Sequence, residues 1–248
     1  MDTSSGFKVH PLFEQTGFKS LSIDHNLYFF TKRFIDILVS LIALTISAPI
    51  LALVAILIRL DSPGPIIFKQ ARVGTRLYKY GKSLLWKQEN FYCYKFRTMR
   101  VDAKPDVHHA YVKALITKDQ ETLKKIEGEN ASFHKLVNDN RITRVGKYLR
   151  KLSLDEIPQF INVLKGDMSV VGPRPAIPYE VEYYTPHYMR RLTAKPGITG
   201  LQQITARSTK SFDEQVNLDI QYIEHQSLWL DIKIIFKTPF TVFTQKGA

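Results

Sequence analysis

The stretch ILVSLIALTISAPILALVAILI, from Ile37 to Ile58, holds 22 residues and no charge. As a helix it would be about 33 Å long, which matches the hydrocarbon core of a bilayer. Lys32 and Arg33 precede it, and Arg59 follows it directly. A helix in the core of a water-soluble domain is rarely this long and this apolar. The stretch therefore predicts a membrane segment.

A proline near the middle of this segment leaves two topologies open. Pro49 lacks a backbone donor and clashes with the preceding turn, so a bend is expected around Ser47 and Pro49. Three basic residues flank each end of the segment, so the charge balance gives neither end a reason to cross the membrane. A kinked spanning helix and two halves that return to the same face both fit.

The remaining composition points to an anionic partner. The chain has 248 residues and 44% hydrophobic content, with 35 Lys and Arg against 23 Asp and Glu, a net charge of +12. The basic residues are spread along the chain without a helix-turn-helix or zinc pattern, which argues against nucleic acid. Cys93 is the single cysteine, so no intrachain disulfide forms, and a reducing compartment fits.

Two stretches after the membrane segment have the character of strands. IIFKQARVG and LLWKQENFYCYKFRTM flank a loop that contains YKYGKS. Alternation in the second stretch places Cys93, Lys95 and Arg97 on one face. Two cations there could hold a phosphate, although a solvated face gives the same pattern. Residues 103–140 are polar and helical in character, and the C-terminal residues read as amphipathic helices that pack in a core or lie against lipid headgroups.

The stretch SLDEIP, from Ser153 to Pro158, pairs two carboxylates, Asp155 and Glu156. The four letters SLDE fit a capping box, in which Ser153 caps a helix and Glu156 reaches back to it. Adjacent carboxylates can instead bind Mg²⁺, and a carboxylate can attack phosphorus. An anionic substrate at such a site needs cations nearby, and the neighbouring sequence supplies three arginines: Arg150, Arg174 in GPRP, and Arg207.

With these motifs in place, the chain resembles the bacterial sugar transferases, the monotopic polyprenyl-phosphate phosphoglycosyl transferases. The matching stretches run in the family's order over residues 30–240 and are KRFIDI, GPIIFKQARVG, YKFRTM, ITRVGKYLRKLSLDEIPQFINVLKGDMSVVGPRP, KPGITGL and SLWLDIKIIFKT. The resemblance implies transfer of a phosphosugar from a nucleotide diphosphosugar to a polyprenyl phosphate. It also implies Mg²⁺ and a covalent aspartyl-phosphosugar intermediate.

The resemblance assigns roles residue by residue. Asp155 matches the nucleophile and a metal ligand, and Glu156 matches its partner. Five residues match positions around the family's phosphate-binding site: Lys95, Arg97, Arg150, Arg174 and Arg207. Asp36 with Lys32 or Arg33 matches an interfacial anchor. The segment from Ser47 to Pro49 matches the break of a re-entrant helix, although Ala48 separates a serine and a proline that the family often has adjacent.

The expected fold is α/β or α+β and mostly helical. An N-terminal extension (1–30) precedes a re-entrant membrane helix (31–60) and a catalytic domain (61–248) with a small sheet, amphipathic interfacial helices and a polar helical insertion (103–140). The implied partners are a UDP-sugar, undecaprenyl phosphate and membrane lipids, with a homodimer left open. The implied location is the cytoplasmic face of the bacterial inner membrane, and the implied form is the family's small one. The alternative is a membrane-attached scaffold without catalysis, which gives Asp155 and Glu156 no task.

Overall fold

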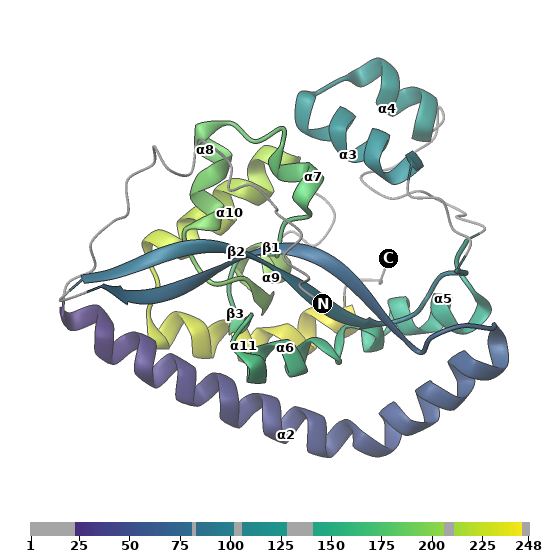
Figure 1. Ribbon diagram of the computed structural model, residues 1–248, viewed down its shortest axis with the longest axis horizontal. Helices are drawn as coiled ribbons and strands as arrows, with labels where there is room; N and C mark the ends of the chain where they lie inside the picture. The colour runs from purple at the N-terminus through teal and green to yellow at the C-terminus, as the bar shows by residue number, and fades with distance from the viewer. Residues whose placement is uncertain (1–22, 81–82, 102–105, 128–140, 206–210, 245–248) are drawn as a thin grey trace, which may run out of the picture.

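A computed structural model describes residues 23–80, 83–101, 106–127, 141–205 and 211–244. Its longest element is α2 (Ile23–Asp61), a continuous helix of 39 residues with Pro49 inside it. Figure 1 shows α2 as a bow that lies along one side of the molecule, with both ends turned toward the other elements. Pro49 withholds one helical hydrogen bond, which accounts for a bend without a break.

In the part of the chain that the structure describes, α2 alone is long and apolar enough to cross a membrane. The apolar window within it is only 11% buried, so most of its side chains face outward. The hydroxyl of Ser47 donates to the carbonyl oxygen of Ala43 at 2.6 Å, one turn earlier. The helix starts at Ile23, so residues 23–30 of the predicted extension belong to the same helix as the membrane segment, and residues 1–22 lie outside the described part of the chain.

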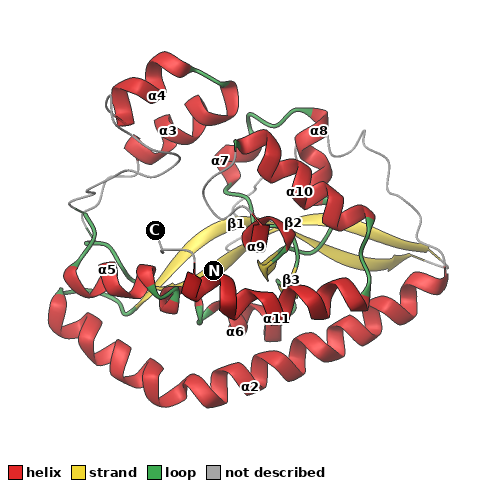
Figure 2. Ribbon diagram, turned by 180° about the vertical axis from the view of Figure 1, so that it is seen from behind, coloured by secondary structure: helices red, strands yellow, loops and turns green. Residues whose placement is uncertain are grey.

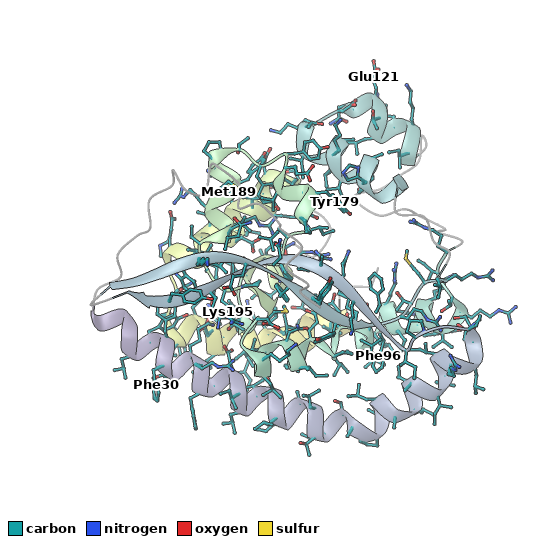
Figure 3. The ribbon with its side chains drawn as sticks, viewed as in Figure 1. Phe30, Phe96, Glu121, Tyr179, Met189 and Lys195 are labelled. Atoms are coloured by element: carbon teal, nitrogen blue, oxygen red, sulfur yellow. The ribbon has the colours of Figure 1, made fainter. Side chains whose placement is uncertain are left out.

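The two ends of α2 attach to the same folded domain. At the N-terminal end, Lys32 forms an ion pair with Asp231 at 2.8 Å. At the C-terminal end, Val54 and Ile58 pack with Phe96. Phe96 lies where the strands approach this end of the helix (Figure 3). The same folded domain thus contacts α2 on both sides of its apolar middle.

The predicted strands are confirmed as an antiparallel hairpin of β1 (Ile67–Tyr80) and β2 (Ser83–Phe96). A second sheet pairs the short parallel strands β3 (Ser169–Val171) and β4 (Gly197–Thr199). Figure 2 shows both sheets surrounded by helices, which confirms the mostly helical character with small sheets.

The other helices follow in chain order: α3 (Asp106–Thr117), α4 (Gln120–Glu127), α5 (Arg144–Lys151), η1 (Leu154–Glu156), α6 (Gln159–Lys165), α7 (Pro178–Val181), α8 (Pro186–Met189), η2 (Arg190–Leu192), α9 (Leu201–Thr205), α10 (Phe212–Glu224) and α11 (Leu228–Thr244). Both views place α6 and α11 between the hairpin and α2 (Figures 1 and 2). Both also place α3 and α4, which belong to the predicted insertion, at the end of the molecule away from α2.

Helix α11 is amphipathic, with its apolar residues divided between the core and the surface. Ile234 is fully buried, whereas Trp229, Phe236 and Phe240 are exposed. Lys233 and Lys237 are exposed on the same helix. Exposed aromatic and basic residues on one helix are typical of a surface that meets lipid headgroups. Of the two readings of this segment, the surface reading fits these aromatic residues.

Candidate active site

The carboxylate pair lies in a tight turn between α5 and α6. Ser153 has a left-handed backbone, with φ of 55°, and Leu154–Glu156 form the single 3₁₀ turn η1. Pro158 caps α6, so its missing N–H falls where no helical partner is required. The chain therefore enters α6 through a 3₁₀ turn followed directly by the proline cap.

The capping-box alternative for SLDE is wrong. The side chain of Ser153 makes no capping hydrogen bond, because the left-handed backbone turns this residue away from the role. Glu156 instead accepts a hydrogen bond from Lys95 Nζ at 2.7 Å. The pair is therefore placed by the contact between η1 and β2.

Asp155 is buried, and burial raises its pKa to about 6, with the negative charge of Glu156 as the second cause. The positive charges of Lys95 and Arg150 oppose this rise. Arg150 is held in place by donating from Nε to the hydroxyl of Thr98 at 2.9 Å. Two adjacent carboxylates at a site with this pKa favour a cation beside them.

The donor set fits a magnesium ion that is shared with a substrate. Mg²⁺ is commonly held by one or two carboxylates together with substrate phosphate oxygens and water. Asp155 and Glu156 can supply those carboxylates. No group of three His, Cys, Asp or Glu side chains suited to a metal occurs among the residues that the structure describes, so a complete protein cage is absent there.

Arg174 follows β3 in the loop Gly172–Pro175, and its side chain is exposed. Its backbone N–H hydrogen bonds to the buried carboxylate of Asp219, and its carbonyl lies 3.4 Å from Arg191 Nη2. Arg191 and Asp219 form a buried ion pair at 2.6 Å. The buried pair thus hydrogen bonds to both the N–H and the carbonyl of Arg174, while the guanidinium of Arg174 stays exposed.

A second buried arginine supports the same loop. Arg72 on β1 donates from Nη1 to the carbonyl of Pro175 at 2.7 Å. Burial, and then the positive charge of Arg174, lower the pKa of Arg72. Burial raises the pKa of the Cys93 thiol and the charge of Arg174 opposes that rise, so the exposed guanidinium lies near both residues on the hairpin. Since Cys93 also feels the charges of Lys95 and Glu156, the loop and the carboxylate pair border one region.

Glycines set the position of this loop. A Cβ on Gly172 would lie 2.3 Å from the carbonyl oxygen of Lys195, and one on Gly197 would lie 2.1 Å from the backbone nitrogen of Gly172. Because backbone atoms cannot yield to such contacts, β3 and β4 approach this closely only with glycine at both positions. The close approach fixes where Arg174 leaves the sheet.

Arg97 occupies a different position from the other predicted cations. It is buried, and its guanidinium donates to the carbonyl of Ser62 at 2.6 Å and also to that of Pro63. These carbonyls follow the end of α2, so Arg97 ties the C-terminal end of the membrane helix to the hairpin. Its phosphate-binding role stays a prediction. Arg207, the fifth predicted cation, lies outside the described residues.

The predicted anchor residues join α2 to the catalytic domain. Lys32 pairs with Asp231, and Arg33 donates to the carbonyls of Val163 and Leu164 at the end of α6. Asp36 is buried and accepts hydrogen bonds from Ser169 Oγ and from the backbone N–H of Val170. Within these contacts, Asp36 pairs with β3 and not with Lys32 or Arg33.

Sequence reasoning missed Arg72, Arg191 and Asp219. Arg72 stands inside the quoted motif GPIIFKQARVG, which was a usable signal. Arg191 and Asp219 are 28 positions apart in separate elements, and neither lies in a recognisable motif.

The chain matches the family model described as "Bacterial sugar transferase" over residues 27–245. It is 44% identical over 220 residues to the galactosyl transferase CpsE of Streptococcus agalactiae serotype III (strain NEM316), covering 88% of this chain and 43% of that protein. It is 38% identical over 228 residues to a UDP-N-acetylgalactosamine-undecaprenyl-phosphate N-acetylgalactosaminephosphotransferase of Aeromonas hydrophila, covering 90% of this chain and 46% of that protein.

For a third relative, the match covers a similar share of both proteins. The exopolysaccharide production protein ExoY of Rhizobium meliloti (strain 1021) is 34% identical over 224 residues, which are 88% of this chain and 87% of that protein. The chain thus spans less than half of the first two relatives and most of the third.

Proposed function

Because the chain belongs to the bacterial sugar transferase family, we propose that it transfers a sugar-1-phosphate from a UDP-sugar to undecaprenyl phosphate. Names of relatives include both substrates, as in the N-acetylgalactosaminephosphotransferase of Aeromonas hydrophila. The structural observation that carries the proposal is the buried Asp155 beside Glu156, with Lys95 and Arg150 as the cations whose charges act on it.

In the first step, a carboxylate oxygen of Asp155 attacks the sugar-bearing phosphorus of the UDP-sugar. The bond from that phosphorus to the bridging oxygen breaks, and UMP leaves. The product is an acyl phosphate, with the phosphosugar on Asp155. A raised pKa suits this task, because a desolvated carboxylate is a stronger nucleophile than one that is fully hydrated.

In the second step, an oxygen of undecaprenyl phosphate attacks the same phosphorus. The bond to Asp155 breaks, the carboxylate is regenerated, and the lipid diphosphate sugar forms. No water enters either step, so exclusion of water from Asp155 protects the acyl phosphate from hydrolysis.

The remaining charged residues neutralise the two phosphates of the donor. Arg174 is exposed on a loop with a fixed backbone, so its planar guanidinium can meet phosphate oxygens in a bidentate contact. Lys95 stays between β2 and Glu156 and offsets the negative charge that gathers at Asp155. A bound Mg²⁺, held by Asp155 and Glu156, would supply further charge neutralisation on the diphosphate.

We propose further that α2 is re-entrant, with its two ends and the catalytic domain on the cytoplasmic face of the inner membrane. Lys32 and Arg33 bind one end of α2 to the domain, and Ile58 and Arg97 bind the other. A spanning helix would place these ends on opposite faces of a bilayer about 30 Å thick, with one domain in contact with both. A bow that dips into the membrane and returns satisfies both sets of contacts.

The direct test of activity is release of UMP from a panel of UDP-sugars mixed with undecaprenyl phosphate and purified protein. The proposal expects release that stops when EDTA removes Mg²⁺ and returns when Mg²⁺ is added. Membrane attachment without UMP release from any sugar of the panel would favour the scaffold alternative.

A further inference from the structure

A cavity separate from the carboxylate pair lies against the N-terminal part of α2. Its volume is about 140 Å³, and its walls include Phe29, Trp86 and the cations Lys32, Arg33 and Lys195. Because a water molecule takes about 30 Å³ in the liquid, this space accommodates a tetrahedral phosphate group with little else. The cavity meets α6 at its last residues, whereas Asp155 precedes the first turn of that helix.

The charges around this cavity do not cancel. Lys32 is neutralised by Asp231 at 2.8 Å. Among the described residues, Arg33 donates only to the neutral carbonyls of Val163 and Leu164, so no carboxylate there forms an ion pair with it. With Asp36 as the acidic side chain of the wall, Arg33 and Lys195 leave a surplus of positive charge.

Lys195 is the cation of this cavity that forms no hydrogen bond through its side chain to the described residues. It is half-buried, and among the described residues no side chain or carbonyl accepts a hydrogen bond from its Nζ. Burial, and then the charge of Arg33, lower the pKa of Lys195 to about 8, and the negative charges of Asp36 and Asp167 only partly oppose this. An ammonium group that is desolvated and unpaired is stabilised by an anion that supplies acceptor oxygens.

The position of the cavity indicates where such an anion would come from. Leu27, Phe30 and Phe34 are exposed on this part of α2. Figure 3 shows Phe30 pointing away from the molecule, whereas Lys195 lies on the inner side, between the helix and the hairpin. If the apolar face of α2 is in lipid, the cavity on its inner side lies close to the level of the headgroups.

Aromatic residues at the cavity support the same depth. The rings of Phe29 and Trp86 meet edge to face with centroids 5.5 Å apart, which joins α2 to the hairpin. Tryptophan with neighbouring basic residues is enriched at the level of lipid headgroups. A free phosphate ion could bind the same cations, but a position at the level of the headgroups would not increase its affinity.

We propose that this cavity binds the phosphate of an anionic membrane phospholipid, with Arg33 and Lys195 as its cations. The bound headgroup bridges α2 and the loop that precedes β4. It therefore fixes the N-terminal end of the membrane helix on the catalytic domain. This site is separate from the acceptor site of the proposed reaction, and it is occupied by bulk lipid.

The chain offers a spectroscopic probe inside the cavity. Its two tryptophans are Trp86 in the wall and Trp229, which is exposed on α11. Trp229→Phe therefore leaves Trp86 as the only tryptophan. This variant, purified in a neutral detergent, is titrated with dihexanoyl phosphatidylglycerol, dihexanoyl phosphatidylcholine or inorganic phosphate, and Trp86 emission is recorded.

The proposal expects a saturable change of emission with phosphatidylglycerol. It expects affinity at least tenfold weaker for phosphatidylcholine and for inorganic phosphate. Adding Lys195→Met should weaken phosphatidylglycerol binding by at least tenfold, and Lys195→Arg should keep it within about threefold, since loss of one charge-assisted contact is of this size. Lys69→Met, an exposed lysine of β1, serves as the matched control and should leave binding unchanged.

Several results would overturn the proposal. Equal responses to the two lipids would mean that the signal reports the detergent micelle. Equal affinity for inorganic phosphate would make this a free-phosphate site. Loss of binding in Arg174→Ala, with binding kept in Lys195→Met, would place the lipid phosphate in the active site. Lys195→Met removes an ammonium group that hydrogen bonds to no residue in the described ranges, so the variant should fold. Lys195→Gln provides the same test if it does not.

Discussion

Lys95 Nζ lies 2.7 Å from Glu156 Oε1, and this contact joins the hairpin strand β2 to the turn that carries Asp155. The lysine lies beside a pair of adjacent carboxylates, and its charge opposes the rise in the pKa of Asp155. The two residues are 61 positions apart in the sequence. Their contact therefore positions the turn and also places a positive charge beside its two carboxylates.

Removing Lys95 should move the acid limb of activity upward in pH. Asp155 must be ionised to attack phosphorus, and its pKa is about 6, so wild-type activity should fall as the pH drops through about 6. Lys95→Met removes a charge that lowers this pKa, so the limb should shift toward neutral pH, beyond any loss of substrate binding. The measurement is kcat/KM for UMP release as a function of pH. Lys95→Arg keeps the charge and is the control. An unchanged limb in Lys95→Met would contradict the coupling.

Neutralising Asp155 should stabilise the protein at neutral pH but not in acid. The pKa is raised on folding, from 3.8 to about 6. Below about pH 4 the group is protonated in both states. As the pH rises from 4 to 6, only the unfolded state loses its proton, so wild-type stability falls. Asp155→Asn escapes this loss, by roughly 1–3 kcal/mol at pH 7.5. Thermal unfolding in detergent at pH 4 and 7.5 measures it, with Asp167→Asn as a control. Equal stability of Asp155→Asn and wild type at pH 7.5 would show that folding does not raise the pKa of Asp155.

Arg174 should matter for the reaction and not for folding. Its side chain is exposed, so Arg174→Ala should leave the unfolding temperature within about 1 °C. A lost charge-assisted contact of roughly 1.5–3 kcal/mol lowers kcat/KM by about 10- to 100-fold. Arg174→Lys should be nearly as damaging, because Lys lacks the planar fork. Arg190→Ala, which removes an exposed arginine paired with Glu224, is the control. Unaltered kinetics in Arg174→Ala would place this arginine outside the site.

The buried pair Arg191 and Asp219 should couple stability to the position of Arg174. Arg191→Met leaves a buried carboxylate without its cation and should cost about 3–5 kcal/mol. Combining it with Asp219→Leu should restore much of the stability. Activity should stay low in the double variant, because the backbone N–H of Arg174 has lost its acceptor. Unfolding and UMP release are measured together. Full activity in the stable double variant would show that the pair serves folding alone.

Topology can be tested with cysteine labelling, because the native Cys93 is buried. In the variant Ser5→Cys, a membrane-impermeant thiol reagent should not label intact cells if α2 is re-entrant. Adding Pro49→Leu restores the helical hydrogen bond and should favour a straight, spanning helix, so labelling should increase. Ready labelling of Ser5→Cys alone from outside would exclude the re-entrant arrangement.

Local patterns in the sequence were sufficient to predict the hairpin and the long apolar helix. The alternation around Cys93 and Lys95 placed both on one strand, and the uncharged run from Ile37 to Ile58 placed the membrane segment. The capping box failed because a letter pattern carries no backbone angle, and Ser153 has a left-handed one. The role of Arg97 at the end of α2 depends on a contact 35 positions away.

The supports of Arg174 could not be predicted for a related reason. Arg191 and Asp219 lie on η2 and α10, and their pairing exists only when both pack beneath the loop after β3. Hydrophobic period and turn chemistry specify elements, whereas a buried ion pair depends on how distant elements meet. The same holds for Lys195, because its place in the cavity beside Arg33 depends on how α2 meets the loop before β4.

The covalent step is the central claim, and mass spectrometry tests it directly. The protein is incubated with UDP-sugars and Mg²⁺ without undecaprenyl phosphate, quenched and digested. The account predicts a phosphosugar adduct on the peptide that contains Asp155, release of one UMP per adduct, and loss of the adduct when undecaprenyl phosphate is added. Asp155→Asn should form no adduct and should lose several orders of magnitude in turnover. An adduct on another residue, or full turnover by Asp155→Asn, would contradict it.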